Sequence, residues 1–70
     1  MGISSKYLNE FIDIVSNDNY GETIYTTVFK NGTYDVTIKS CCNNVIMDLV
    51  KKGYNMEMYS KGLHVWHTED

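Results

Sequence analysis

Hydrophobic positions along the chain follow a helical spacing of three to four residues in two segments and a strand spacing of two residues in two others. Residues 4–16 carry apolar side chains at three- and four-residue spacing after a serine that suits an N-cap, which predicts an amphipathic helix. Residues 40–52 show the same spacing, and two lysines followed by Gly53 are typical of a helix end. The apolar stripe of this second helix is expected to face the core through Cys42, Val45, Ile46, Leu49 and Val50.

Residues 22–39 predict a β-hairpin. Two β-branched and aromatic runs are separated by Asn31-Gly32, the dipeptide preferred in two-residue type I′ turns. In the register that this turn imposes, Phe29 faces Tyr34 and one side of the hairpin is apolar. The reverse side is mostly polar.

Residues 54–70 predict a second hairpin, with Lys61-Gly62 as its turn. Ser60 would then face Leu63, and Tyr59 would face His64. The side that belongs to the core gathers Met56, Met58, Leu63 and Val65. The opposite side carries Tyr59 and Trp66, the single tryptophan of the chain, which core packing does not explain.

The order helix, hairpin, helix, hairpin predicts one small α+β domain over residues 1–70. Its simplest architecture is a two-layer α-β-β-α-β-β fold, in which both helices cover one face of a four-stranded, largely antiparallel sheet. The other face of the sheet stays open. We expect that face to be a dimer or ligand interface, with the residues Ile24, Val28, Tyr59, His64 and Trp66.

Length and composition favour self-association. A chain of 70 residues buries only about 60% of its unfolded surface, so small domains often need extra support. Cys41 and Cys42 are adjacent and suit no disulfide framework, which indicates a reducing compartment. Without a leader-like or membrane-spanning segment, we expect a cytoplasmic homodimer. The chain lacks Arg, Pro, Ala and Gln, a bias of AT-rich coding that fits a phage or mobile element of a low-GC bacterium.

The net charge of −3 is unevenly distributed. No lysine lies between Tyr7 and Phe29, and this stretch contains the acidic residues Glu10, Asp13, Asp18 and Glu22, which we call the acidic segment. We expect it to contact a basic host protein. In one version it competes as a DNA mimic for a nucleic-acid-binding protein. Direct nucleic-acid binding is disfavoured, because no arginine is present to grip phosphates bidentately.

The sequence contains no motif that indicates catalysis or metal binding. His64 and His67 point to opposite sides of a strand, so they do not form a ligand pair. A nucleophile pair of Cys41 with His64 or His67 would need spatial adjacency, an orienting third group and a pocket, none of which the sequence shows. No Gly-rich phosphate loop is present. We therefore expect neither an enzyme nor a bound cofactor or metal.

These observations favour a small acidic homodimeric interaction module that binds and inhibits or modulates a host protein. Two alternatives use the aromatic side chains differently. In the first, the protein sequesters a nucleotide or another small ligand in an aromatic cleft between Tyr59 and Trp66. In the second, the open sheet face stacks the bases of single-stranded nucleic acid.

Overall fold

The computed structural model describes residues 2–67, so the end of the second predicted hairpin, residues 68–70, lies outside the described part. Two helices, one short 3₁₀ helix and four strands follow one another along the chain. They are α1 (Ser5–Val15), η1 (Asp18–Tyr20), β1 (Ile24–Lys30), β2 (Thr33–Ser40), α2 (Asn43–Lys51), β3 (Tyr54–Tyr59) and β4 (Gly62–His67). The predicted α-β-β-α-β-β order is confirmed.

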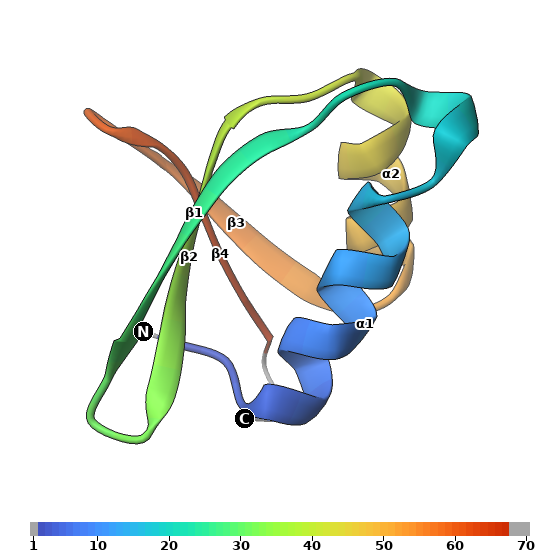
Figure 1. Cartoon of the computed structure of the whole chain (residues 1–70). Coiled ribbons are helices and arrows are strands. Elements are labelled where there is room, and N and C mark those ends of the chain that lie inside the picture. The colour runs from blue at the N-terminus through green and yellow to red at the C-terminus, as the bar shows by residue number, and fades with distance from the viewer. Residues whose placement is uncertain (1, 68–70) are drawn as a thin grey trace.

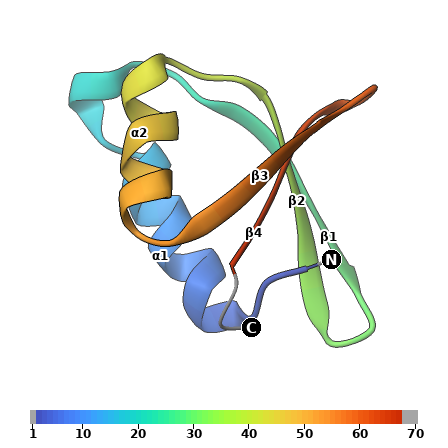
Figure 2. The ribbon, with the colours of Figure 1, turned by 180° about the vertical axis from the view of Figure 1, so that it is seen from behind.

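The four strands form one sheet in the order β1-β2-β4-β3, and all neighbouring strands are antiparallel. Both helices lie on the same face of this sheet (Figures 1 and 2). The predicted two-layer α+β fold is therefore confirmed. The strand order places the second strand of each hairpin at the centre, so β1 and β3 are the two edges of the sheet.

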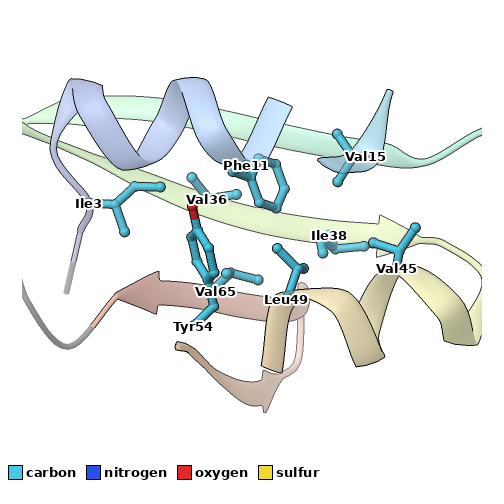
Figure 3. Close-up of a cluster of buried hydrophobic side chains, with 9 residues drawn as sticks. All are labelled: Ile3, Phe11, Val15, Val36, Ile38, Val45, Leu49, Tyr54 and Val65. Carbon is cyan, nitrogen blue, oxygen red and sulfur yellow. The ribbon is translucent and has the colours of Figure 1, made fainter. Parts of the chain in front are cut away.

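The core lies between the helices and the covered face of the sheet (Figure 3). Phe11 and Val15 reach it from α1, and Val45 and Leu49 reach it from α2. The remaining buried hydrophobic side chains come from the strands and the N-terminal segment, and they are Ile3, Val36, Ile38, Tyr54 and Val65. Their alternation along β2 is the period-two pattern expected of a sheet that is covered on one face.

The first hairpin has the predicted register. Phe29 pairs with Tyr34, and the turn residues Asn31 and Gly32 both have positive φ, at 54° and 84°. That pair of angles is what a type I′ turn requires, and Asn and Gly adopt it at low cost. The turn at Asn31-Gly32 is therefore confirmed.

The turn of the second hairpin differs from the prediction. Tyr59 pairs with Gly62, and Glu57 pairs with His64, so the loop residues are Ser60 and Lys61 rather than Lys61 and Gly62. Every strand residue keeps its predicted side, because the register moves by two positions and side chains alternate with a period of two. Gly62, whose φ is 137°, becomes the first residue of β4.

The two hairpins are joined along a short seam. Only three residue pairs connect β2 to β4, from Val36–Val65 to Ile38–Leu63. Beyond this seam β2 pairs instead with the N-terminal segment, where Ile3 and Tyr34 exchange two backbone hydrogen bonds of 2.8 Å each. Ile3 is fully buried as a result. A residue outside every predicted element thus contributes to the core.

Three side chains that the sequence pattern assigns to the core are exposed. Phe29 is 64% exposed and Met58 is 72% exposed, because both lie near hairpin turns that extend away from the helices (Figure 1). Val50 is 59% exposed on the outer surface of α2. The helices are too short to cover the full length of the strands, so the apolar side of each hairpin is only partly buried.

A hydrogen bond ties the segment after α1 to α2. The Tyr20 hydroxyl donates to the Asp48 carboxylate. This hydrogen bond is the largest cause that raises the pKa of Tyr20, followed by burial and by the negative charge of Asp48. The folded state therefore favours the protonated phenol more than the unfolded state does.

Alkaline pH is expected to weaken this contact. Since the folded pKa of Tyr20 lies above the unfolded value of about 10, the stabilisation is complete below pH 10 and is lost as the pH rises through the folded pKa. Urea unfolding of the wild type and of Tyr20→Phe should give a stability difference that shrinks over this alkaline range. A difference that stays constant from neutral to alkaline pH would show that the phenol proton does not contribute.

Candidate functional site: an aromatic patch on the open sheet face

Three aromatic side chains gather on the face of the sheet that carries no helix. Tyr59 lies at the end of β3, and His64 and Trp66 lie two residues apart on β4. We call Tyr59, His64 and Trp66 the aromatic patch. Residues at alternate positions of β4, such as Val65, are buried on the opposite face among the core side chains. The patch is therefore a consequence of strand alternation, as the sequence predicts.

The rings of the patch are in mutual contact. The Tyr59 and His64 rings are stacked, with centroids 5.3 Å apart and an interplanar angle of 17°. The His64 and Trp66 centroids lie 5.6 Å apart at an interplanar angle of 31°. Because Tyr59 pairs with Gly62, His64 occupies the level between Tyr59 and Trp66 along β4.

His64 is covered rather than exposed. It is only 7% exposed, although it belongs to the open face, whereas Tyr59 is 51% exposed and Trp66 is half-buried. The two larger rings flank the imidazole. On the neighbouring strands, the residues paired with His64 are Thr37 of β2 and Glu57 of β3. His64 thus lies on the predicted open face but is covered by the two neighbouring rings, and its part in an interface stays a prediction. His64 supports the two rings that present the surface.

Polar side chains border the patch on the β3 side. Glu57 is exposed and lies directly across from His64, and Asn55 lies across from Trp66. The Asn55 Nδ2 atom is buried and has no hydrogen-bond partner among the described residues. The patch thus combines apolar rings with a negative charge and an amide at its edge.

The other two predicted interface residues, Ile24 and Val28, lie elsewhere on the open face. Both are exposed on β1. Strand β2 separates them from β4, and in the row of paired residues Thr37 lies between Thr26 and His64. The predicted five-residue interface is therefore divided into the aromatic patch and an apolar edge on β1.

The acidic segment lies on the helical side of the molecule. Glu10 and Asp13 are on α1, which packs on the covered face of the sheet, and Glu22 precedes β1 (Figures 1 and 2). Asp13 and Glu22 are exposed and Glu10 is half-buried. Asp18 belongs to η1, and its side chain is outside what the structure describes. The aromatic patch and the helix-borne acids therefore face different directions.

His67 has a structural environment that sequence reasoning missed. Its ring stacks on Tyr7 with centroids 3.9 Å apart and lies edge-to-face with Tyr54 at 4.8 Å. Its Nε2 atom is 3.0 Å from the Lys52 carbonyl oxygen, which can only accept, so Nε2 carries the proton. The Tyr54 hydroxyl in turn donates to the Tyr7 carbonyl at 2.8 Å. The cluster joins α1 to the second hairpin.

Cys41 lies in an environment that disfavours its thiolate form. Burial raises the pKa of the Cys41 thiol, and the neighbouring Cys42 raises it further. A higher pKa lowers the thiolate fraction at neutral pH, and the thiolate is the nucleophile. Among residues 2–67, no group of three or more His, Cys, Asp or Glu side chains is arranged to hold a metal ion.

Besides the aromatic patch on the open face, the molecule has an apolar groove on the covered face. This groove of about 250 Å³ runs between the start of α2 and the tip of the second hairpin, lined among others by Cys41, Ile46, Met58 and Leu63. The sequence pattern gave no indication of it, because Met58 alternates in register with core residues. The groove is opposite in orientation to the aromatic patch, which lies on the open face.

No helix within the described part of the chain has the length and apolar character needed to cross a membrane. Comparison of the chain with protein-family models, with curated proteins and with solved structures finds no match in any of the three. The function therefore has to be inferred from the surfaces that the fold presents.

Proposed function

We propose that this protein is a small interaction module that binds a partner protein through the aromatic patch and modulates it. The observation that carries the proposal is the position of Tyr59 and Trp66 around a covered His64 on the helix-free face of the sheet. Tyrosine and tryptophan supply much contact area at low entropic cost and dominate the binding energy of many interfaces.

The contacts within the patch favour binding because they fix the rings in advance. Each large ring packs on the His64 imidazole, so little rotational freedom is lost when a partner docks. The rings also face a polar border that includes Glu57. A partner that inserts an arginine or lysine would place its cation over Trp66, beside the Glu57 carboxylate. We therefore propose a partner with a basic and partly apolar surface.

The acidic segment supports a second proposal, in which it competes with nucleic acid for a basic protein. Asp13 and Glu22 are exposed in a stretch of sequence without lysine. Such binding would depend mainly on charge, so it should weaken steeply with added salt, whereas binding by the aromatic patch should weaken less. The two surfaces face different directions and are therefore separable by mutation.

The two ligand-based alternatives are less favoured by the geometry. The His64 ring occupies the space between Tyr59 and Trp66 within one chain, so a planar ligand would have to stack on an outer ring face. Single-stranded nucleic acid would additionally place phosphates near Glu57, whose charge opposes them. A protein partner avoids both difficulties.

The test is partner binding by three variants. The tagged protein would capture a partner from a nuclease-treated lysate of a low-GC bacterium, and the purified partner would then be titrated. We expect Trp66→Ala to weaken binding at least about tenfold, as is typical for a central aromatic contact. The control is Met47→Ala, since Met47 is an exposed hydrophobic side chain that lies on α2 rather than on the open sheet face, and it should bind like the wild type.

The third variant separates the two proposed surfaces. It combines Glu10→Gln, Asp13→Asn, Asp18→Asn and Glu22→Gln, and it should bind nearly as well as the wild type if the aromatic patch is the site. Loss of binding by this variant, together with unchanged binding by Trp66→Ala, would contradict the patch and support the acidic segment. Thermal unfolding of every variant would establish that the fold is intact.

A further inference from the structure

Strand β1 presents an unprotected edge of the sheet. Among the described residues no segment pairs with its outer side, because the order β1-β2-β4-β3 places it at the end of the sheet. Six of its seven residues are exposed, including Phe29 near its far end. Edge strands are commonly protected by proline or by charged side chains, and β1 has neither between Ile24 and Phe29. Such an edge is suited to pairing with another strand.

The hydrogen bonds of the neighbouring strand show which backbone groups of β1 face outward. In an antiparallel pair, the N–H and C=O of a residue point together, either towards or away from the paired strand. Tyr34 uses both groups to bond Ile3, away from β1. Its paired residue, Phe29, therefore directs both of its own groups to the outer edge. By alternation, Thr27 and Tyr25 do the same.

We propose that β1 pairs antiparallel with β1 of a second copy, centred on Thr27. Thr27 then lies opposite Thr27 of the second copy, and Tyr25 lies opposite Phe29 of the second copy. Each of the three resulting pairs exchanges two backbone hydrogen bonds, which gives six in total from the three outward-facing residues of each chain. Pairing centred on any other residue leaves some of these outward groups unused.

Side chains support this register as well. It sets the exposed Phe29 ring beside Tyr25 of the second copy, an aromatic cross-strand pair. It also brings Lys30, at the end of β1, towards Glu22 of the second copy, just before the start of that strand. Opposite charges are therefore diagonal neighbours at both ends of the paired strands, and no like charges face each other.

The other edge of the sheet is less suited to self-pairing. Strand β3 carries Glu57 near its middle, so antiparallel pairing of two copies would bring two carboxylates close together. Its first residue, Tyr54, is buried. The choice of β1 therefore follows from charge and exposure, and it moves the expected dimer interface away from Trp66.

The dimer is a continuous eight-stranded sheet. The twofold axis of an antiparallel strand pair is perpendicular to the sheet, so the helices of both copies lie on one side and both aromatic patches lie on the other. From β4 of one copy to β4 of the other, five strand spacings amount to about 24 Å. The resulting bivalence rests on the proposed function, whereas the dimer itself does not.

Sedimentation equilibrium of the full chain at micromolar concentration tests the dimer, with a mass twice that of the 8.1 kDa chain expected. Thr27→Pro removes an N–H that faces outward, so it deletes two intermolecular hydrogen bonds and no bond within the chain. We expect its dimer dissociation constant to rise at least about 30-fold, as two lost hydrogen bonds imply. Trp66→Ala is the control and should remain dimeric.

A charge exchange tests the register without proline. Lys30→Glu should raise the dimer dissociation constant about three- to tenfold. At each end of the paired strands, the carboxylate introduced at position 30 would lie near the Glu22 carboxylate of the other copy. Adding Glu22→Lys to Lys30→Glu should restore wild-type affinity. The same restoration would not occur if the two residues did not meet across the interface.

Amide exchange gives a direct readout of the paired groups. Protection of the Tyr25, Thr27 and Phe29 amides should increase with protein concentration, while that of Thr26 and Val28 should not, because their groups face β2. A wild-type protein that is monomeric into the millimolar range would overturn the proposal. So would a dimer that dissociates in Trp66→Ala but persists in Thr27→Pro.

Discussion

Replacement of Phe11 by alanine is expected to leave the domain close to unfolding at room temperature. The Phe11 side chain is fully buried between α1 and the sheet, and its ring meets Tyr25 edge-to-face at 5.2 Å. Removing a buried phenylalanine side chain costs about 3–5 kcal/mol, because both burial and packing are lost. A domain of 70 residues has roughly 4–10 kcal/mol of stability in total. Urea and thermal unfolding should show the midpoint temperature lowered by at least about 15 °C.

The chain provides a matched control in its second phenylalanine. Phe29 is mostly exposed, and its ring contacts Tyr34 with centroids 5.0 Å apart. Phe29→Ala should cost less than about 1 kcal/mol when it is measured at concentrations where the protein is monomeric. Equal losses for Phe11→Ala and Phe29→Ala would contradict the assignment of the core to the helix-covered middle of the sheet.

The sequence predicted the elements and the faces of the strands well because both depend on local periodicity. A type I′ turn at Asn31-Gly32 fixes the register of the first hairpin, and a period of two then assigns each side chain to a face. The predicted turn of the second hairpin lies one residue too far along the chain. Every side chain nevertheless keeps its predicted face, because the register differs from the prediction by two positions. Period is thus a more robust signal than the position of the turn.

Exposure could not be predicted from the alternation alone. Phe29 and Met58 obey the alternation but extend beyond the helices, and only the relative lengths and crossing of the elements reveal this. Ile3 is buried because the two hairpins separate beyond their short seam and the N-terminal segment fills the space beside β2. Such effects depend on how distant segments meet. No local pattern encodes them.

The candidate site was predicted in composition but not in arrangement. Tyr59, His64 and Trp66 share a face as expected, yet His64 is enclosed by its two neighbours, a result of the Tyr59–Gly62 pairing. Ile24 and Val28 belong to the far edge because β2, rather than β1, pairs with the second hairpin. Strand order involves contacts between hairpins, and the sequence of each hairpin contains little information about it.

Gly62→Ala is expected to destabilise the domain by about 2–4 kcal/mol, since it adds backbone strain to a direct steric conflict. The Gly62 φ of 137° is a conformation that side-chain-bearing residues rarely adopt. A Cβ atom at this position would lie 2.6 Å from the Ile38 carbonyl oxygen and 3.0 Å from the Thr37 Cγ2 atom. Since Ile38 belongs to the three-pair seam between β2 and β4, relief of the conflict would have to separate the two hairpins.

Gly32→Ala separates the steric conflict from the backbone strain. Gly32 also has positive φ, at 84°, but nothing lies within 4 Å of the Cβ atom that the substitution would add. Its cost should therefore be limited to the left-handed conformation, about 1–2 kcal/mol. Urea unfolding of both variants should rank Gly62→Ala as the more damaging. If the two losses were equal, the close approach of Gly62 to Ile38 would contribute nothing, and the seam between the hairpins would tolerate a wider spacing than the structure shows.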